Sequence, residues 1–145
     1  MSLTVWQAAG WLGEHKPTRE ETRALLDVVD RDLRDSAVAA ISPDAQLGLA
    51  YNAALQAATI ALAASGYRAA RERKHYVTIQ SLTYTIGTDP VAVRKLDAFR
   101  KKRNIGDYER AGSTSATEAA ELRDLARLLR DDVHRWLEHH HPELL

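Results

Sequence analysis

The sequence predicts an all-α protein, an up-and-down bundle of four to five helices. Three observations lead to this prediction. Apolar residues recur three and four positions apart along four long units, as they do on the buried face of a helix. A capping residue or a proline stands where these units begin. No stretch alternates apolar and polar residues between turns, which is the pattern of a half-buried strand.

Length and composition favour one folded domain. The chain has 145 residues, of which 45% are hydrophobic and 28% are charged, as in ordinary globular domains. We therefore expect residues 1–145 to form a single helical domain. Residues 1–16 should form a short helical segment that docks on this domain through Trp6 and Trp11, because large aromatic side chains commonly anchor a terminus to a core. An aromatic contact with a partner is the alternative.

The predicted helices cover residues 18–41, 43–65, 71–86, 90–103 and 115–140. Their starts carry either the spacing of a capping box or a cap followed by proline. These signals are Thr18 with Glu21, Ser42 with Pro43, Asp89 with Pro90, and Ser115 with Glu118. Gly87 is expected to end the third helix, so that the third long unit is broken there.

Several polar residues resemble site residues but have a structural interpretation. On the first long helix we expect a solvated charged face rather than a metal site, formed by Asp27, Asp30, Arg31, Asp32, Arg34 and Asp35. His75 is expected on the inward face of its helix, where a lone histidine is more often a hydrogen-bonded core group than a catalyst. The histidines at 139–141 point in different directions on a helix, so we expect neither a metal nor a cofactor.

The composition excludes some classes of chemistry and directs attention to one region. The sequence contains no cysteine, which excludes disulfides, thiolate metal sites and cysteine nucleophiles. The formal net charge is zero, yet residues 68–74 hold four basic and one acidic residue, and residues 94–110 hold seven basic and three acidic. A local basic face can attract phosphate even on a neutral protein. Solvated helix faces are the alternative.

The sequence also suggests a location in the cell. The first residues lack the basic and long apolar regions of a signal peptide. No apolar run approaches the roughly 20 residues that span a bilayer. We therefore expect a cytoplasmic protein without membrane contact.

The stretch from Leu96 to Tyr108 has more features of a site than any other part of the sequence. Ala92, Leu96, Phe99 and Arg103 are spaced so that they share one helix face, and Arg103 therefore continues an apolar stripe. A guanidinium group is expensive to bury alone. We therefore expect Arg103 at the rim of the core or in a cleft.

Arg103 and its neighbours have the chemistry of a phosphate site. Arginine can clamp a phosphate with two hydrogen bonds and stabilise the charge of a phosphoryl transition state. Asn104 can orient a phosphate oxygen, and Tyr108 can donate a proton or stack on a base. Further attraction for a nucleic-acid backbone comes from Arg100, Lys101 and Lys102. Alternatively, Arg103 and Asn104 cap the helix end and tie the following loop to the bundle.

Two parts of the chain resemble proteins of the HEPN-domain superfamily. The run Tyr-Asn-Ala-Ala-Leu-Gln-Ala-Ala at residues 51–58, with residues 64–68 and His75, is similar to the second helix and following turn of these proteins. The pattern Arg103-Asn104-x-x-x-Tyr108 is similar to the superfamily's motif of an arginine, a polar residue, a short spacer and a histidine. The resemblance covers residues 18–139, and Tyr108 stands where the motif has its histidine.

The resemblance implies a helical bundle and a choice of functions. Many HEPN proteins are metal-independent endoribonucleases of toxin–antitoxin or defence systems, whose arginine and histidine meet across a homodimer interface. Others bind RNA or a partner without cleavage. Here the resemblance implies a homodimer that binds RNA or a nucleotide phosphate in a cleft at Arg103 and Tyr108, with a cognate toxin or antitoxin as a further partner. Catalysis is expected to be weak or absent, because a phenol does not replace an imidazole as a proton shuttle near neutral pH.

Two alternatives stay open. In the first, the protein is a metal-independent endoribonuclease in which Arg103 stabilises the transition state and Tyr108 or His75 transfers protons. His75 is a candidate because it precedes the helix that neighbours the same cleft. In the second, the bundle is purely structural.

Overall fold

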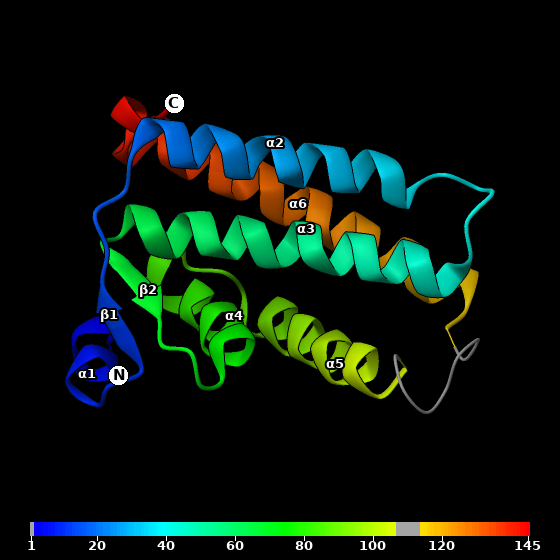
Figure 1. Cartoon of the computed structure of the whole chain (residues 1–145), viewed down its shortest axis with the longest axis horizontal. Coiled ribbons are helices and arrows are strands. Elements are labelled where there is room, and N and C mark those ends of the chain that lie inside the picture. Colours follow the sequence, from blue (N-terminus) through cyan, green and yellow to red (C-terminus); the bar gives the residue numbers. More distant parts are fainter. Residues whose placement is uncertain (1, 107–113) are drawn as a thin grey trace.

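A computed structural model describes the backbone of residues 2–106 and 114–145 and the side chains of residues 2–103 and 114–145. These residues form an all-α bundle, as the sequence predicted (Figure 1). The helices are α1 (Leu3–Ala8), α2 (Arg19–Ser36), α3 (Pro43–Ala64), α4 (Lys74–Thr85), α5 (Pro90–Gly106) and α6 (Ala116–His140), followed by the short 3₁₀ helix η1 (Pro142–Leu144). A two-stranded sheet, β1 (Leu12–Glu14) with β2 (Tyr67–Ala69), joins the N-terminal segment to the bundle.

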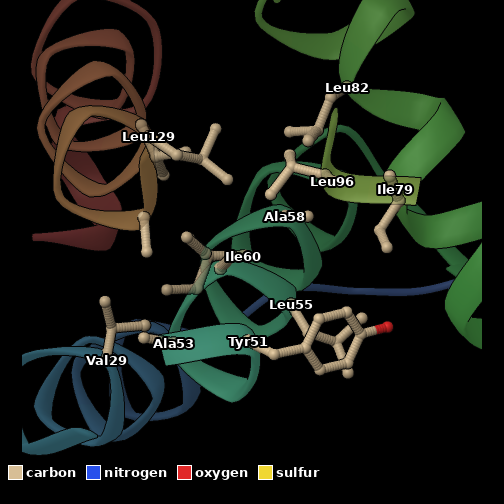
Figure 2. Close-up of a cluster of buried hydrophobic side chains, with 14 of the residues drawn as sticks. Val29, Tyr51, Ala53, Leu55, Ala58, Ile60, Ile79, Leu82, Leu96 and Leu129 are labelled. Atoms are coloured by element: carbon tan, nitrogen blue, oxygen red, sulfur yellow. The ribbon is translucent and has the colours of Figure 1, made fainter. Parts of the chain in front are cut away.

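Helix α3 is the centre of the bundle. Helices α2 and α6 pack against one side of α3, and α4 and α5 lie on the other side (Figure 1). Figure 2 shows side chains of α3 facing in both directions, with Ile60 on the side of Leu129 and Ala58 beside Leu96. Alanine recurs along α3, and its small side chain lets the surrounding helices approach closely. The fully buried Ala58 and Ala61 are examples.

Helix α3 also corrects one expectation. By length and composition alone this 22-residue helix is apolar enough to cross a membrane, although the sequence was expected to hold no such run. Within the bundle, 72% of the 18-residue apolar stretch of α3 that meets these criteria is buried. The central helix of a folded bundle meets the same criteria of length and hydropathy.

The predicted caps at four helix starts are confirmed. Thr18 and Ser42 each accept a hydrogen bond from the backbone three residues later, and Asp89 accepts one from Val91 at 2.7 Å. Ser115 and Glu118 form a complete capping box. Gly87 separates α4 from α5 in a left-handed conformation (φ +71°), which glycine adopts without strain. Helix α2 ends at Ser36 rather than at residue 41. The backbone N–H groups of Ala37 and Val38 bond to carbonyls three residues earlier, which tightens the last turn and ends the helix.

The two strands were not predicted, and their pairing changes the N-terminal region. Leu12 pairs with Ala69 and Glu14 with Tyr67 in antiparallel register. Strands of three residues are too short to show alternation, so only the pairing across about 55 intervening positions reveals them. Trp6 is buried as expected, whereas Trp11 lies beyond α1 and remains 37% exposed.

One member of the expected solvated face of α2 is buried. Asp32 is 2% exposed, and its carboxylate accepts a hydrogen bond of 2.7 Å from the Asn52 side chain on α3. Arg31 donates a second hydrogen bond of 3.0 Å to the other oxygen of Asp32. The expectation of a fully solvated face was therefore wrong at Asp32, because α3 brings an amide donor to a position that sequence spacing on α2 does not reveal.

Candidate functional site

A basic groove lies where the start of α4 meets the end of α5. It has a volume of about 640 Å³ and is lined by Arg71, Arg73, Lys74, His75, Tyr76, Arg100 and Lys101. Five of these residues carry a permanent positive charge, and none of the described lining residues is acidic. We call this feature the basic groove. The two basic segments of the sequence, 68–74 and 94–110, thus contribute to one surface.

Two aromatic rings lie close to guanidinium groups that line the groove. The Arg73 guanidinium carbon lies 4.6 Å from the centre of the Tyr76 ring and 5.8 Å from that of Trp11. Arg100 lies 5.4 Å from the Tyr76 ring and donates a hydrogen bond of 2.8 Å to Asp97. A cation is attracted to the face of an aromatic ring. These contacts orient the guanidinium groups of Arg73 and Arg100 on the same aromatic ring.

Arg103 and His75 meet at Tyr51. The Arg103 guanidinium carbon lies 5.2 Å from the centre of the Tyr51 ring, and the Tyr51 hydroxyl lies 3.5 Å from Nδ1 of His75. Tyr51 is 2% exposed, and Arg103 is half-buried, at the rim of the core where the sequence placed it. On α5, Leu96 and Phe99 are buried as expected, with Val93 in place of the half-buried Ala92.

His75 is exposed, so the expectation that it faces the core was wrong. The helix expected from residue 71 begins at Lys74, because residues 67–69 form strand β2 and the chain turns before entering α4. His75 therefore lies in the first turn of α4, at the mouth of the groove, instead of in the middle of a packed helix. Arg103 does not line this groove, and the structure links it to His75 through Tyr51.

The environment sets the protonation states of Tyr51 and His75. Burial raises the pKa of Tyr51 to about 12, against the opposing influence of Arg100 and Arg103. The phenol therefore stays neutral at pH 7 and can donate its proton in a hydrogen bond to a neutral imidazole. Partial desolvation lowers the pKa of His75 below 6.5, and the positive charges of Arg103, Lys74 and Arg100 lower it further. His75 is thus mainly a neutral imidazole at pH 7, able to accept a proton.

We predict that Arg103→Gln raises the pKa of His75 toward 6.5, because it removes the largest of the charge effects and leaves desolvation in place. An NMR titration of the His75 ring measures this shift, and Arg94→Gln on the same helix is the matched control.

The lowered pKa of His75 also makes the stability of the protein depend on pH. In the wild type, the unfolded chain binds more protons than the folded protein at pH values between the pKa of His75 in the folded protein and that in the unfolded chain. Stability should therefore fall as the pH drops through 6.5, and Arg103→Gln should weaken that dependence. An unchanged His75 pKa in Arg103→Gln would contradict this geometry.

The other predicted site residues have different surroundings. Lys101 lines the groove, with a side chain that is 66% exposed and lies 3.6 Å from Asp97. Lys102 is not among the lining residues. Its Nζ lies 2.7 Å from the carboxylate of Glu118, which ties α5 to the start of α6 and lowers the pKa of Glu118.

Two of the predicted catalytic groups cannot be compared with this geometry. The side chain of Asn104 and the whole of Tyr108 lie outside the described residues. The prediction that they act with Arg103 therefore stays a prediction.

Sequence reasoning did not single out four residues of the site. Arg71, Arg73 and Lys74 were counted only as part of a basic segment, and Tyr76 was not considered. The charge count over residues 68–74 was a usable signal, because four basic residues stand close to a predicted helix start. Nothing in the spacing indicated that Trp11 lies beside Arg73, because the pairing of β1 with β2 creates that contact.

In the part of the chain that the structure describes, no three histidine, aspartate or glutamate side chains lie close enough together to bind a metal ion. The rings of His140 and His141 instead lie 6.0 and 4.9 Å from that of Trp136. No family model matches the chain, and neither the curated proteins nor the solved structures include a match.

Proposed function

We propose that the protein is a HEPN-like RNA-binding protein that holds the phosphate backbone of its ligand in the basic groove, with weak or absent catalysis. The observation that carries the proposal is the gathering of five permanent cations and His75 around one groove without an acidic lining residue among those described. Such a concentration of like charge is unfavourable in the empty protein, and an anion with several phosphates relieves it.

The side chains in the groove suit phosphate in particular. Arginine presents a planar set of donors that matches two phosphate oxygens, and lysine adds a mobile point charge. Arg73 and Arg100 are already oriented by Tyr76, so less conformational entropy is lost when they bind. Arg103 does not line the groove but is linked to it through Tyr51 and His75, and it can contact a phosphate that binds beside His75.

The meeting of His75 and Arg103 favours a second candidate function, metal-independent cleavage of RNA. A neutral imidazole can take the proton from a ribose 2′-hydroxyl as that oxygen attacks the adjacent phosphorus, while the arginine stabilises the developing negative charge. The bond from phosphorus to the 5′-oxygen breaks, and that oxygen must receive a proton. Tyr108 is the residue expected to supply it. The expected homodimer and the expected toxin or antitoxin partner remain part of this proposal.

Arg103→Ala tests the proposed function. We expect RNA binding to weaken by about 1.5–3 kcal/mol, roughly 10- to 150-fold, because a charge-assisted hydrogen bond is lost. The fold should persist, since the core ring of Tyr51 remains in place. Gel-shift assays with labelled single-stranded RNA and total tRNA measure binding, and the same samples incubated in EDTA report cleavage. Arg94→Ala is the control, because it removes an equal charge from an exposed position of α5 outside the groove.

Each outcome assigns the protein to a class. Cleavage that disappears in Arg103→Ala would establish the ribonuclease. Binding without cleavage would establish the binding protein. If the wild type neither binds nor cleaves RNA, the proposal is wrong, and a protein partner becomes the first candidate for the basic groove.

A further inference from the structure

A smaller hollow adjoins the basic groove on the side of the N-terminal segment. It has a volume of about 160 Å³ and is lined by Gly10, Trp11, Ala70, Glu72, Arg73 and Val77. Arg73 also lines the groove, so it forms the boundary between the two. We propose that this hollow binds one base of a single-stranded nucleic acid whose phosphates occupy the basic groove, with the base stacked on Trp11. This inference rests on the proposed function and adds a base-binding subsite to it.

Trp11 has the properties of a stacking platform. It is 37% exposed, yet its ring packs against the buried Trp6 with the ring centres 5.7 Å apart. Its backbone oxygen accepts a hydrogen bond of 2.8 Å from Ala70, next to the pairing of Leu12 with Ala69. An exposed aromatic ring on a well-held backbone can stack a base with little loss of entropy.

The hollow suits a base better than a phosphate. Glu72 lines the hollow, and a carboxylate repels a phosphate, whereas it can accept a hydrogen bond from the amino group of a base. Trp11 and Val77 provide apolar surface that a phosphate would not use. A volume of about 160 Å³ is close to the roughly 150 Å³ cavity that holds a benzene ring in another protein.

The position of Arg73 connects the hollow to the groove. Its guanidinium carbon lies 5.8 Å from the centre of the Trp11 ring, so it can bind the phosphate adjoining a base that stacks on that ring. A nucleotide offers this combination of a flat face and an adjacent charge. Bases inside a duplex are already paired and stacked, so the subsite selects single strands.

The test compares two ligands of equal length, an oligoadenylate and an abasic ribose–phosphate oligomer. The abasic oligomer reports phosphate binding alone, and the oligoadenylate reports phosphate and base binding together. We expect wild-type protein to bind oligoadenylate roughly 5- to 150-fold more tightly, the range for loss of one base–aromatic stack. Tryptophan fluorescence should be quenched by oligoadenylate only. Trp11→Leu should lose this preference and the quenching. Any weakening of phosphate binding through the lost contact between Trp11 and Arg73 should lower the affinity for both ligands alike.

Tyr84→Leu is the matched control, because Tyr84 is also 37% exposed and also packs on Trp6, at 5.2 Å, but does not line the hollow. Equal wild-type affinities for the two ligands would overturn the subsite and leave the proposed function standing. An equal loss of preference in Tyr84→Leu would overturn it too, by showing that the effect passes through packing on Trp6. Binding of neither ligand would overturn both the subsite and the proposed function. If Trp11→Leu fails to fold, the comparison of the two ligands on wild-type protein still tests the base-binding subsite.

Discussion

Tyr51→Ala is expected to lower the free energy of unfolding by about 3–5 kcal/mol, the cost of removing a large aromatic ring from a core. Tyr51 is 2% exposed and belongs to the main hydrophobic cluster, so its ring leaves a cavity that the surrounding helices only partly refill. The Arg103 guanidinium carbon lies 5.2 Å from the centre of the same ring, so removal of the ring should also weaken RNA binding. Urea denaturation of purified protein measures the loss of stability, and a gel shift under native conditions measures binding.

Tyr51→Phe distinguishes the contribution of the ring from that of its hydroxyl. The hydroxyl lies 3.5 Å from His75, at the long limit of a hydrogen bond, so its removal should cost less than about 1 kcal/mol. The Phe ring keeps both its place in the core and its attraction for Arg103. If Tyr51→Phe loses as much stability and RNA binding as Tyr51→Ala, the hydroxyl rather than the ring links the core to the site.

The second large effect is expected from removal of three charges in the basic groove. The triple variant Arg71→Gln, Lys74→Gln and Lys101→Gln should bind single-stranded RNA roughly 100-fold more weakly at about 0.1 M salt. Each neutralised phosphate contributes a salt slope of about −0.7 on a single strand, so the slope should become shallower by about two. The folded state should be little affected, because all three side chains are exposed and the ion pair that is lost, between Lys101 and Asp97, lies at the surface. Binding isotherms over a series of salt concentrations measure both quantities.

A variant with the same change in net charge controls for long-range attraction. Arg94→Gln, Arg127→Gln and Arg135→Gln remove three exposed cations outside the groove. We expect this control to keep most of the affinity and nearly all of the salt slope. An equal loss in the control would mean that RNA responds to overall charge, and that the basic groove is not the binding site.

The helices of this protein could be predicted from the sequence because their signals are local. Ser42 and Pro43 begin α3, Gly87 ends α4, and Ser115 with Glu118 begins α6 through contacts within a few residues. The buried stripe of each helix follows from a period of 3.6 residues. The position of Arg103 at the edge of such a stripe was predictable for the same reason.

The candidate site depended on contacts between distant parts of the chain. The carboxylate of Asp32 became buried because Asn52 on another helix satisfies it, and His75 became exposed because strand β2 delays the start of α4. Trp11 reached Arg73 only through the pairing of β1 with β2.

By itself, then, the sequence determined the order of the helices, the caps at four of their starts, the apolar core and the two basic segments, since each depends on neighbouring residues. The tertiary structure alone decided that these segments form one groove and which aromatic rings border it. Such packing joins residues that are far apart in the chain, and no local pattern of side chains records those pairings.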